Sequence, residues 1–189
     1  MKMRVFGHCG FAGALLLALT GCGNYTITFE LDDVINGYTG ADIPNEPLPV
    51  DIVVMTKDET ERYPEIVEGR MGADEWFHAR TDELTKISGI SPDHIFALRD
   101  GGPAPQRDRR VRETLLSPRN GGPRTVQIKI KHPQAGSSKA ALVIYAGFKD
   151  ETGRGYRKTP PIVIQPPPAG KKEIVIDVSK RSWAKRAVR

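Results

Sequence analysis

The sequence predicts an all-β fold, namely an antiparallel β-sandwich with one short helical insertion. Its 189 residues include 19 glycines and 15 prolines but only 7% aromatic residues, which favours many turns over a helical bundle. Seven short runs alternate β-branched or aliphatic residues with polar ones between turn signals, as strands do. The regular alternation of strands and helices in a Rossmann fold or a TIM barrel is missing.

The strand-like runs differ in the burial that they predict. The run 125–131 has the clearest pattern, with a valine and two isoleucines on one side and a glutamine and two lysines on the other. The run 141–148 is more uniformly apolar, which predicts a central strand covered on both faces. Proline-rich flanks make 161–165 an edge strand. In chain order, the expected strands are 25–31, 50–55, 94–99, 125–131, 141–148, 161–165 and 173–178.

One helix is expected between the second and third strands, over residues 73–87. Asp74 and Glu75 lie in its first turn, where the helix dipole favours acidic side chains, and Gly89 ends it. A second short helix is expected over 108–116. One face of the longer helix carries Trp76, Arg80, Leu84 and Ile87.

The amino terminus has the pattern of a targeting segment. Two cations, Lys2 and Arg4, precede a run of apolar and small residues over 5–19, as in a secretory signal peptide. The next residues, Leu19-Thr20-Gly21-Cys22, resemble the bacterial lipobox, in which the cysteine is acylated and becomes the first residue of the mature chain. The alternative is an ordinary signal peptide that contains a cysteine. We therefore expect a signal peptide over 1–21, a sandwich domain over 22–178 and a basic tail over 179–189.

Lipidation of Cys22 would restrict both the chemistry and the location of the protein. Cys9 lies in the segment that is removed, so the mature chain would have no free thiol, no disulfide and no cysteine-bound metal. Acyl chains would hold it at a membrane through Cys22. Gly23 follows the cysteine where aspartate would indicate the inner membrane, which favours the outer membrane, facing the periplasm. Export also argues against a nucleic-acid partner.

Charge is unevenly placed along the expected mature chain, whose net charge is +3. Residues 22–98 contain 16 acidic and 5 basic residues, whereas residues 99–189 contain 21 basic and 7 acidic ones. Two basic stretches, 99–124 and the tail around Trp183, should be exposed. The first is either a solvated loop or a contact with acidic lipid, lipopolysaccharide or an acidic partner. The tail is either a disordered end or a segment lying on a membrane surface.

No motif in the sequence indicates an enzyme or a cofactor site. The histidines of the mature chain lack metal-ligand spacing and fit solvated or capping roles. A nucleophile elbow and a Walker A loop are absent from the sequence. An acidic cluster after the second strand fits a turn, with a calcium site as the alternative. The histidines are His78, His94 and His132, and the acidic cluster consists of Asp58, Glu59 and Glu61.

Four segments of the chain carry a resemblance to a known family. They are the lipobox, the run 48–58 (LPVDIVVMTKD), the helix start 73–77 (ADEWF), and a carboxy-terminal block of 146–150 (AGFKD) with 155–157 (GYR). Together they resemble the outer-membrane lipoprotein of type VI secretion systems, the TssJ (SciN-like) family. The resemblance implies a transthyretin-like sandwich with a structural function.

The same resemblance implies a partner and a binding loop. Members of that family tether an inner-membrane protein, through its periplasmic domain, by the loop between their first two strands. Here that loop would span 32–49 and contain Asn36, Gly37, Tyr38, Ile43 and Pro44. A different class of function is a periplasmic or surface module that binds carbohydrate, which needs exposed aromatics on a sheet face. A lipid-anchored hydrolase is the third hypothesis. The candidate aromatics are Tyr38, Tyr63, Tyr145 and Tyr156.

Overall fold

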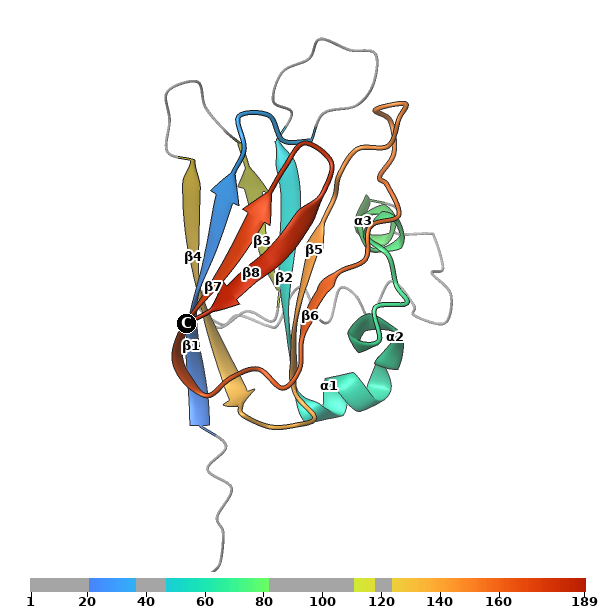
Figure 1. Ribbon diagram of the computed structural model, residues 1–189. Helices are drawn as coiled ribbons and strands as arrows, with labels where there is room; N and C mark the ends of the chain where they lie inside the picture. Colours follow the sequence, from blue (N-terminus) through green and yellow to red (C-terminus); the bar gives the residue numbers. More distant parts are fainter. Residues whose placement is uncertain (1–20, 37–46, 82–110, 118–123) are drawn as a thin grey trace, which may run out of the picture.

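The chain folds as a β-sandwich of two four-stranded sheets (Figure 1). The computed structural model describes residues 21–36, 47–81, 111–117 and 124–189. The first sheet has the order β4-β1-β7-β8, and the second sheet has the order β3-β2-β5-β6. The strands of the first sheet are β1 (Gly21–Leu31), β4 (Thr125–Ala135), β7 (Gly170–Val178) and β8 (Trp183–Val188). Those of the second sheet are β2 (Leu48–Met55), β3 (Val111–Leu116), β5 (Ala141–Ala146) and β6 (Ile162–Ile164).

The pairing confirms the sandwich but makes the first sheet mixed. β1 runs antiparallel to β4 and parallel to β7, whereas the other named pairs are antiparallel. The parallel pair arises because β6 and the connection after it return the chain to the end of the sandwich where β1 begins. The predicted antiparallel β-sandwich is confirmed, with β1 and β7 as the one parallel pair among the named strands.

The main core lies between the sheets and follows the alternation of each strand. On β1, the inward-facing Tyr25, Ile27 and Phe29 are fully buried, while Asn24 on the other face is exposed. They belong to one cluster with inward side chains of the second sheet such as Ile52. Burial of each such side chain contributes about 1.5–3 kcal/mol to folding, so the alternating pattern fixes the register of the strands.

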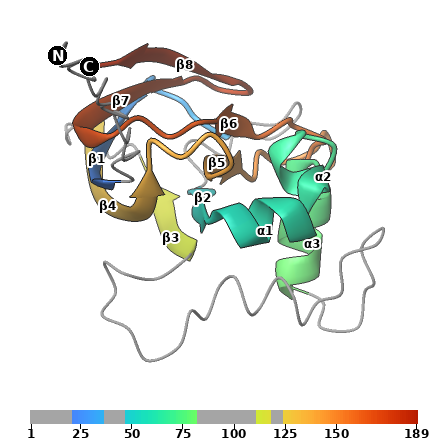
Figure 2. The same cartoon turned by 90° about the horizontal axis from the view of Figure 1, so that it is seen from below.

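Three helices between β2 and β3 form a layer on the outer face of the second sheet (Figure 2). They are α1 (Lys57–Arg62), α2 (Pro64–Val67) and α3 (Ala73–Thr81). A second apolar cluster joins them to β2 and β5, with Trp76 and Phe77 packed near Val143. Because β5 is covered on both faces, all six of its residues are buried. The prediction of a central strand there is confirmed.

Most expected strands are found, with limits shifted by a few residues. β6 lies at an edge of its sheet, as its proline-rich flanks predict. The expected strand 94–99 lies outside the described residues, as does the part of the expected helix beyond Thr81. The predicted helical insertion is found between β2 and β3, but it contains three short helices, because residues that follow β2 form α1 and α2 before α3 begins. The acidic cluster that was expected to form a turn is part of α1.

Two assignments in the basic half of the chain are corrected. The expected helix 108–116 is wrong over its described part, because Val111–Leu116 pair antiparallel with β2 as β3. The expected tail 179–189 is largely the edge strand β8, which pairs with β7. Trp183 holds β8 in place by packing against the main core.

In the described part of the chain, no helix is long and apolar enough to cross a bilayer.

Candidate functional site

Strand β1 connects two ends of the sandwich that differ in character. At its beginning, Gly21 lies opposite Ala135, beside the turn that joins β4 to β5. At its end, Leu31 lies opposite Val178 of β7. We call the first the anchor end, because it holds the predicted lipidation residue, and the second the distal end. Among the described residues, the distal end contains 32–36, 117, 124, 147–161 and 179–182 (Figure 1).

At the anchor end, the core begins almost immediately after the predicted lipidation residue. Cys22 is the second residue of β1, at a register shift between Gly21 and Gly23. Tyr25 is already buried, and its hydroxyl donates a hydrogen bond of 2.5 Å to the carbonyl of Pro168. Burial raises the pKa of Tyr25 to about 12, so this hydroxyl is a donor at neutral pH. An acyl group on Cys22 would therefore be joined to the sandwich by a very short connection.

At the distal end, Asn36 fastens the connection between β1 and β2. Its side-chain amide donates to the carbonyl of Pro47 at 3.0 Å, and its side-chain oxygen accepts a hydrogen bond of 2.7 Å from the backbone N–H of Lys149. Asn36 is buried and has a φ of +57°, which asparagine tolerates better than most residues. Asn36 therefore ties Pro47, just before β2, to Lys149, which follows β5.

Only one of the five predicted partner-contact residues can be placed. Asn36 is a structural fastener rather than an exposed contact. Gly37, Tyr38, Ile43 and Pro44 lie outside the described residues. The binding role of that loop stays a prediction, but its base is now defined.

Next to this fastener, three of the four segments that carry the family resemblance meet at Gly147. A β-carbon placed on Gly147 would lie 2.9 Å from side-chain atoms of Pro49, Phe77 and Tyr156, which is closer than packing allows. Pro49 accepts a hydrogen bond from the Gly147 N–H at 2.9 Å. The ring of Tyr156 packs on that of Phe77 at 5.1 Å, and the Lys149 ammonium lies 5.1 Å from the Tyr156 ring centre. Glycine is required here by the close approach of three elements.

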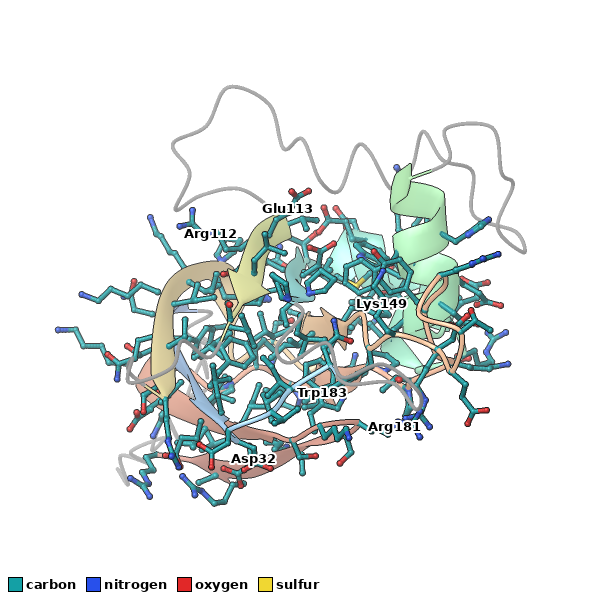
Figure 3. All side chains as sticks on the ribbon, turned by 90° about the horizontal axis from the view of Figure 1, so that it is seen from above. Asp32, Arg112, Glu113, Lys149, Arg181 and Trp183 are labelled. Carbon is teal, nitrogen blue, oxygen red and sulfur yellow. The ribbon has the colours of Figure 1, made fainter. Side chains whose placement is uncertain are left out.

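A second distal feature is Arg181, which lies near Trp183 (Figure 3) and is contacted by Arg157. The Nε and Nη2 atoms of Arg181 are buried without a hydrogen-bond partner in the described residues. Arg157 donates from Nη1 to the Arg181 carbonyl at 3.4 Å. The Trp183 ring meets Phe148 edge to face, with centres 6.4 Å apart. Buried guanidinium donors without acceptors suit a carboxylate, which accepts two such hydrogen bonds at once. The basic character of the tail is the only sequence feature that points to this pair.

A buried polar cluster under α3 was also missed from the sequence. Trp76 donates from Nε1 to Oδ2 of Asp51, and both side chains are fully buried. The only local signal is an aspartate inside the apolar run of β2. Its burial and its contacts with the helix make it part of the scaffold behind the distal end.

The residues considered for metal binding or catalysis have structural roles where they are described. His132 is fully buried. Its Nδ1 accepts a hydrogen bond of 3.1 Å from the Gln134 N–H and therefore carries no proton. Its Nε2 then donates to the Ala141 carbonyl at 3.0 Å, so the ring is neutral. The expectation of a solvated or capping histidine is wrong here. Glu59 accepts the Thr56 N–H at 2.6 Å in a capping box. His94 lies outside the described residues, and His78 is exposed on α3.

The described residues offer no cluster suited to a metal ion. No group of three or more His, Cys, Asp and Glu side chains converges among them. Glu61 of the acidic cluster instead pairs with Lys139 at 2.7 Å, and this hydrogen bond lowers the pKa of Glu61.

Among the described residues, the aromatic side chains do not form the exposed row that carbohydrate binding needs. Tyr63 and Tyr145 are buried, and Tyr156 packs against α3. Tyr38 lies outside the described residues. The described part of the chain therefore gives no support to a sugar-binding sheet face.

Comparison with known proteins gives matches to solved structures alone. No family model matches the chain, and no curated protein matches it. It is similar to the T6SS lipoprotein TssJ1 from Pseudomonas aeruginosa, with 16% identity, a TM-score of 0.44 and coverage of 87% of this chain and 96% of that one. It is also similar to Serratia marcescens Lip, a membrane-bound component of the type VI secretion system, with 11% identity, a TM-score of 0.45 and coverage of 87% and 97%. A third match is a structure described as the T6SS protein TssM C-terminal domain from EAEC, with 15% identity, a TM-score of 0.45 and coverage of 87% and 98%.

Proposed function

We propose that this chain is a lipid-anchored structural component of a cell-envelope assembly, namely the outer-membrane lipoprotein of a type VI secretion system that tethers an inner-membrane partner. The observation that carries the proposal is the geometry of β1. Cys22, the predicted lipidation residue, is the second residue of this strand, and the strand ends at the connection to β2. With a rise of about 3.3 Å per residue, the strand separates the membrane anchor from the distal end by about 30 Å.

The position of the family-like segments supports the same proposal. They are spread over more than 100 residues of the sequence, yet three of them pack together at Gly147. Lys149 then connects this block to Asn36 at the base of the β1–β2 connection. The segments that resemble the family thus support the loop that the resemblance assigns to partner binding. A tether needs this arrangement, a rigid body that presents a loop far from its lipid.

The first experiment tests the anchor. We expect the chain, produced in a bacterium with an outer membrane, to incorporate labelled palmitate and to sediment with outer membranes. Cys22→Ser should remain unprocessed and unlabelled. Cys9→Ser is the matched control, because that cysteine lies in the segment that would be removed, and it should label normally. Palmitate on the Cys22→Ser variant would refute the assignment.

The second experiment tests the tether. A photocrosslinking amino acid in place of Tyr38 should capture the periplasmic domain of an inner-membrane protein in envelopes of the native bacterium. The same amino acid in place of Ser138, an exposed residue of the β4–β5 turn at the anchor end, is the control and should not capture it. Affinity purification that recovers no inner-membrane protein, together with equal crosslinking from both positions, would overturn the proposal.

A further inference from the structure

The outer face of the first sheet carries a group of lysines close to Cys22. Asn24 of β1 lies between Lys131 of β4 and Lys171 of β7 in the register of the sheet. In the next row of the same face, Thr26 lies between Lys129 and Glu173. The three lysines are exposed and line an open groove of about 820 Å³. We call this surface the lysine face.

The lysine face holds an excess of positive charge, because Lys129, Lys131 and Lys171 share it with one carboxylate, Glu173. Farther along the same sheet, Arg186 pairs with Glu30 at 2.5 Å. Arg124 pairs in the same way with Asp33 at 2.5 Å. The carboxylate within the lysine face, Glu173, accepts a hydrogen bond of 2.7 Å from the Thr28 hydroxyl in the neighbouring row. Exposed Lys172 adds a further cation to the same end of β7.

The distance from the predicted anchor matches the depth of a lipid headgroup layer. Asn24 lies two residues after Cys22, or about 7 Å along the strand. The polar layer on each side of a bilayer is about 5–7 Å deep. Lysine side chains extend a charged group on a long apolar stem, so those at positions 131 and 171 reach this layer when the lipid on Cys22 is inserted.

We propose that the lysine face binds the anionic phospholipid headgroups of the membrane that holds the anchor. The inference rests on the proposed lipidation of Cys22 but not on the tethered partner. Electrostatic attraction between clustered lysines and an anionic surface would set the sandwich at a fixed angle to the membrane, so that the distal end points away from it. The acyl chains supply retention, and the lysines supply orientation.

The test uses the processed full-length lipoprotein, extracted from membranes and reconstituted in vesicles. One set of vesicles contains only phosphatidylcholine, and the other contains 30% phosphatidylglycerol. Acetylation rates of individual lysines are measured by mass spectrometry. We expect Lys129, Lys131 and Lys171 to react about fivefold more slowly in anionic vesicles and to recover in about 1 M salt, because screening removes the attraction. Lys180, exposed in the β7–β8 connection at the distal end, should react equally in both.

Two variants of equal charge change separate the lysine face from general electrostatics. Lys129→Glu/Lys131→Glu should abolish the slow reaction of Lys171, whereas Arg154→Glu/Lys180→Glu, at the distal end, should leave it unchanged. Circular dichroism of each variant checks that the fold is retained. Equal rates in the two vesicle types would overturn the inference even if palmitate labels Cys22. If palmitate does not label Cys22 but these lysines of vesicle-bound protein still react more slowly in anionic vesicles, the proposal for the lysine face stands. Only the proposed lipid anchor is then refuted.

Discussion

The indole Nε1 of Trp76 donates a hydrogen bond of 2.7 Å to Oδ2 of Asp51, and neither side chain is exposed. The Trp76 ring also stacks on that of Tyr145, with centres 4.6 Å apart and planes 3° from parallel. Asp51 and Tyr145 lie directly opposite each other on β2 and β5. One carboxylate in the middle of the second sheet thus fixes the position of α3, which in turn supports Gly147 and the distal end.

We predict that Trp76→Phe lowers the free energy of unfolding by about 3 kcal/mol, because it removes a hydrogen bond to a buried carboxylate and leaves space in the core. Tyr145→Phe is the matched control in the same cluster. The Tyr145 hydroxyl is buried without a hydrogen-bond partner in the described residues, so its loss should cost less than about 1 kcal/mol. Urea unfolding followed by circular dichroism measures both. A loss below about 1 kcal/mol for Trp76→Phe would contradict the role given to its hydrogen bond with Asp51.

A second prediction concerns the fastener at Asn36. Both Asn36→Ala and Asn36→Gly lose the hydrogen bonds to Pro47 and Lys149. Alanine must also adopt the positive φ that glycine accepts freely, so the alanine variant should be less stable than the glycine variant by about 1 kcal/mol. Urea unfolding gives this difference.

The same two variants test whether the fastener serves the loop. Both should reduce crosslinking from position 38 to the partner by a similar factor, because the lost hydrogen bonds, rather than the strain, hold the loop base. Crosslinking that falls only in the alanine variant would show that stability, not the loop, is affected.

A third prediction uses the alkaline titration of Tyr25. Burial raises the pKa of Tyr25 in the folded protein to about 12, compared with 10 for an ordinary tyrosine. Between these values the unfolded chain has released the proton and the folded chain still holds it. The stability contribution is therefore complete below pH 10 and is lost as the pH rises towards 12. Tyr25→Phe should make the fall of unfolding free energy between pH 9 and 11 less steep; an unchanged slope would contradict this assignment. Burial shifts the pKa of Tyr145 in the same direction, so part of the fall will remain.

The sequence predicts the elements whose pattern is local. Residues 125–131 alternate clearly, and residues 141–148 are continuously apolar, so their strand character and relative burial follow from the chain itself. The residues of β3 show the opposite case. Arginine, glutamate and leucine favour helices, and only pairing with β2 makes Val111–Leu116 a strand.

Edge position and long-range pairing explain what the sequence does not predict. β8 carries charged residues on an exposed edge, as edge strands often do, and therefore resembles a solvated tail. The lysine face depends on the parallel pairing of β1 with β7, which places Lys171 beside residues that are more than 140 positions away in the sequence. Asn36 and Arg181 likewise acquire their roles from contacts with distant segments.

Arg181 gives the last prediction, in which stability and partner binding change in opposite directions. Its buried Nε and Nη2 atoms lack hydrogen-bond partners in the described residues, and unsatisfied buried donors cost about 1–3 kcal/mol each. Arg181→Met keeps the apolar stem and removes these donors, so we expect the free energy of unfolding to rise by about 1 kcal/mol. If these atoms donate hydrogen bonds to a carboxylate of the partner protein, the same variant should reduce recovery of that partner from envelopes about tenfold.

Arg154→Met is the control, because Arg154 is exposed in the β5–β6 connection at the same end of the sandwich. It should change neither the unfolding free energy nor the recovery of the partner by a measurable amount. Urea unfolding and quantitative affinity purification are performed on both variants. A more stable Arg181→Met protein that still recovers the partner fully would show that the Arg181 guanidinium is not part of the binding surface. A less stable variant would show that Arg181 instead supports the β7–β8 connection.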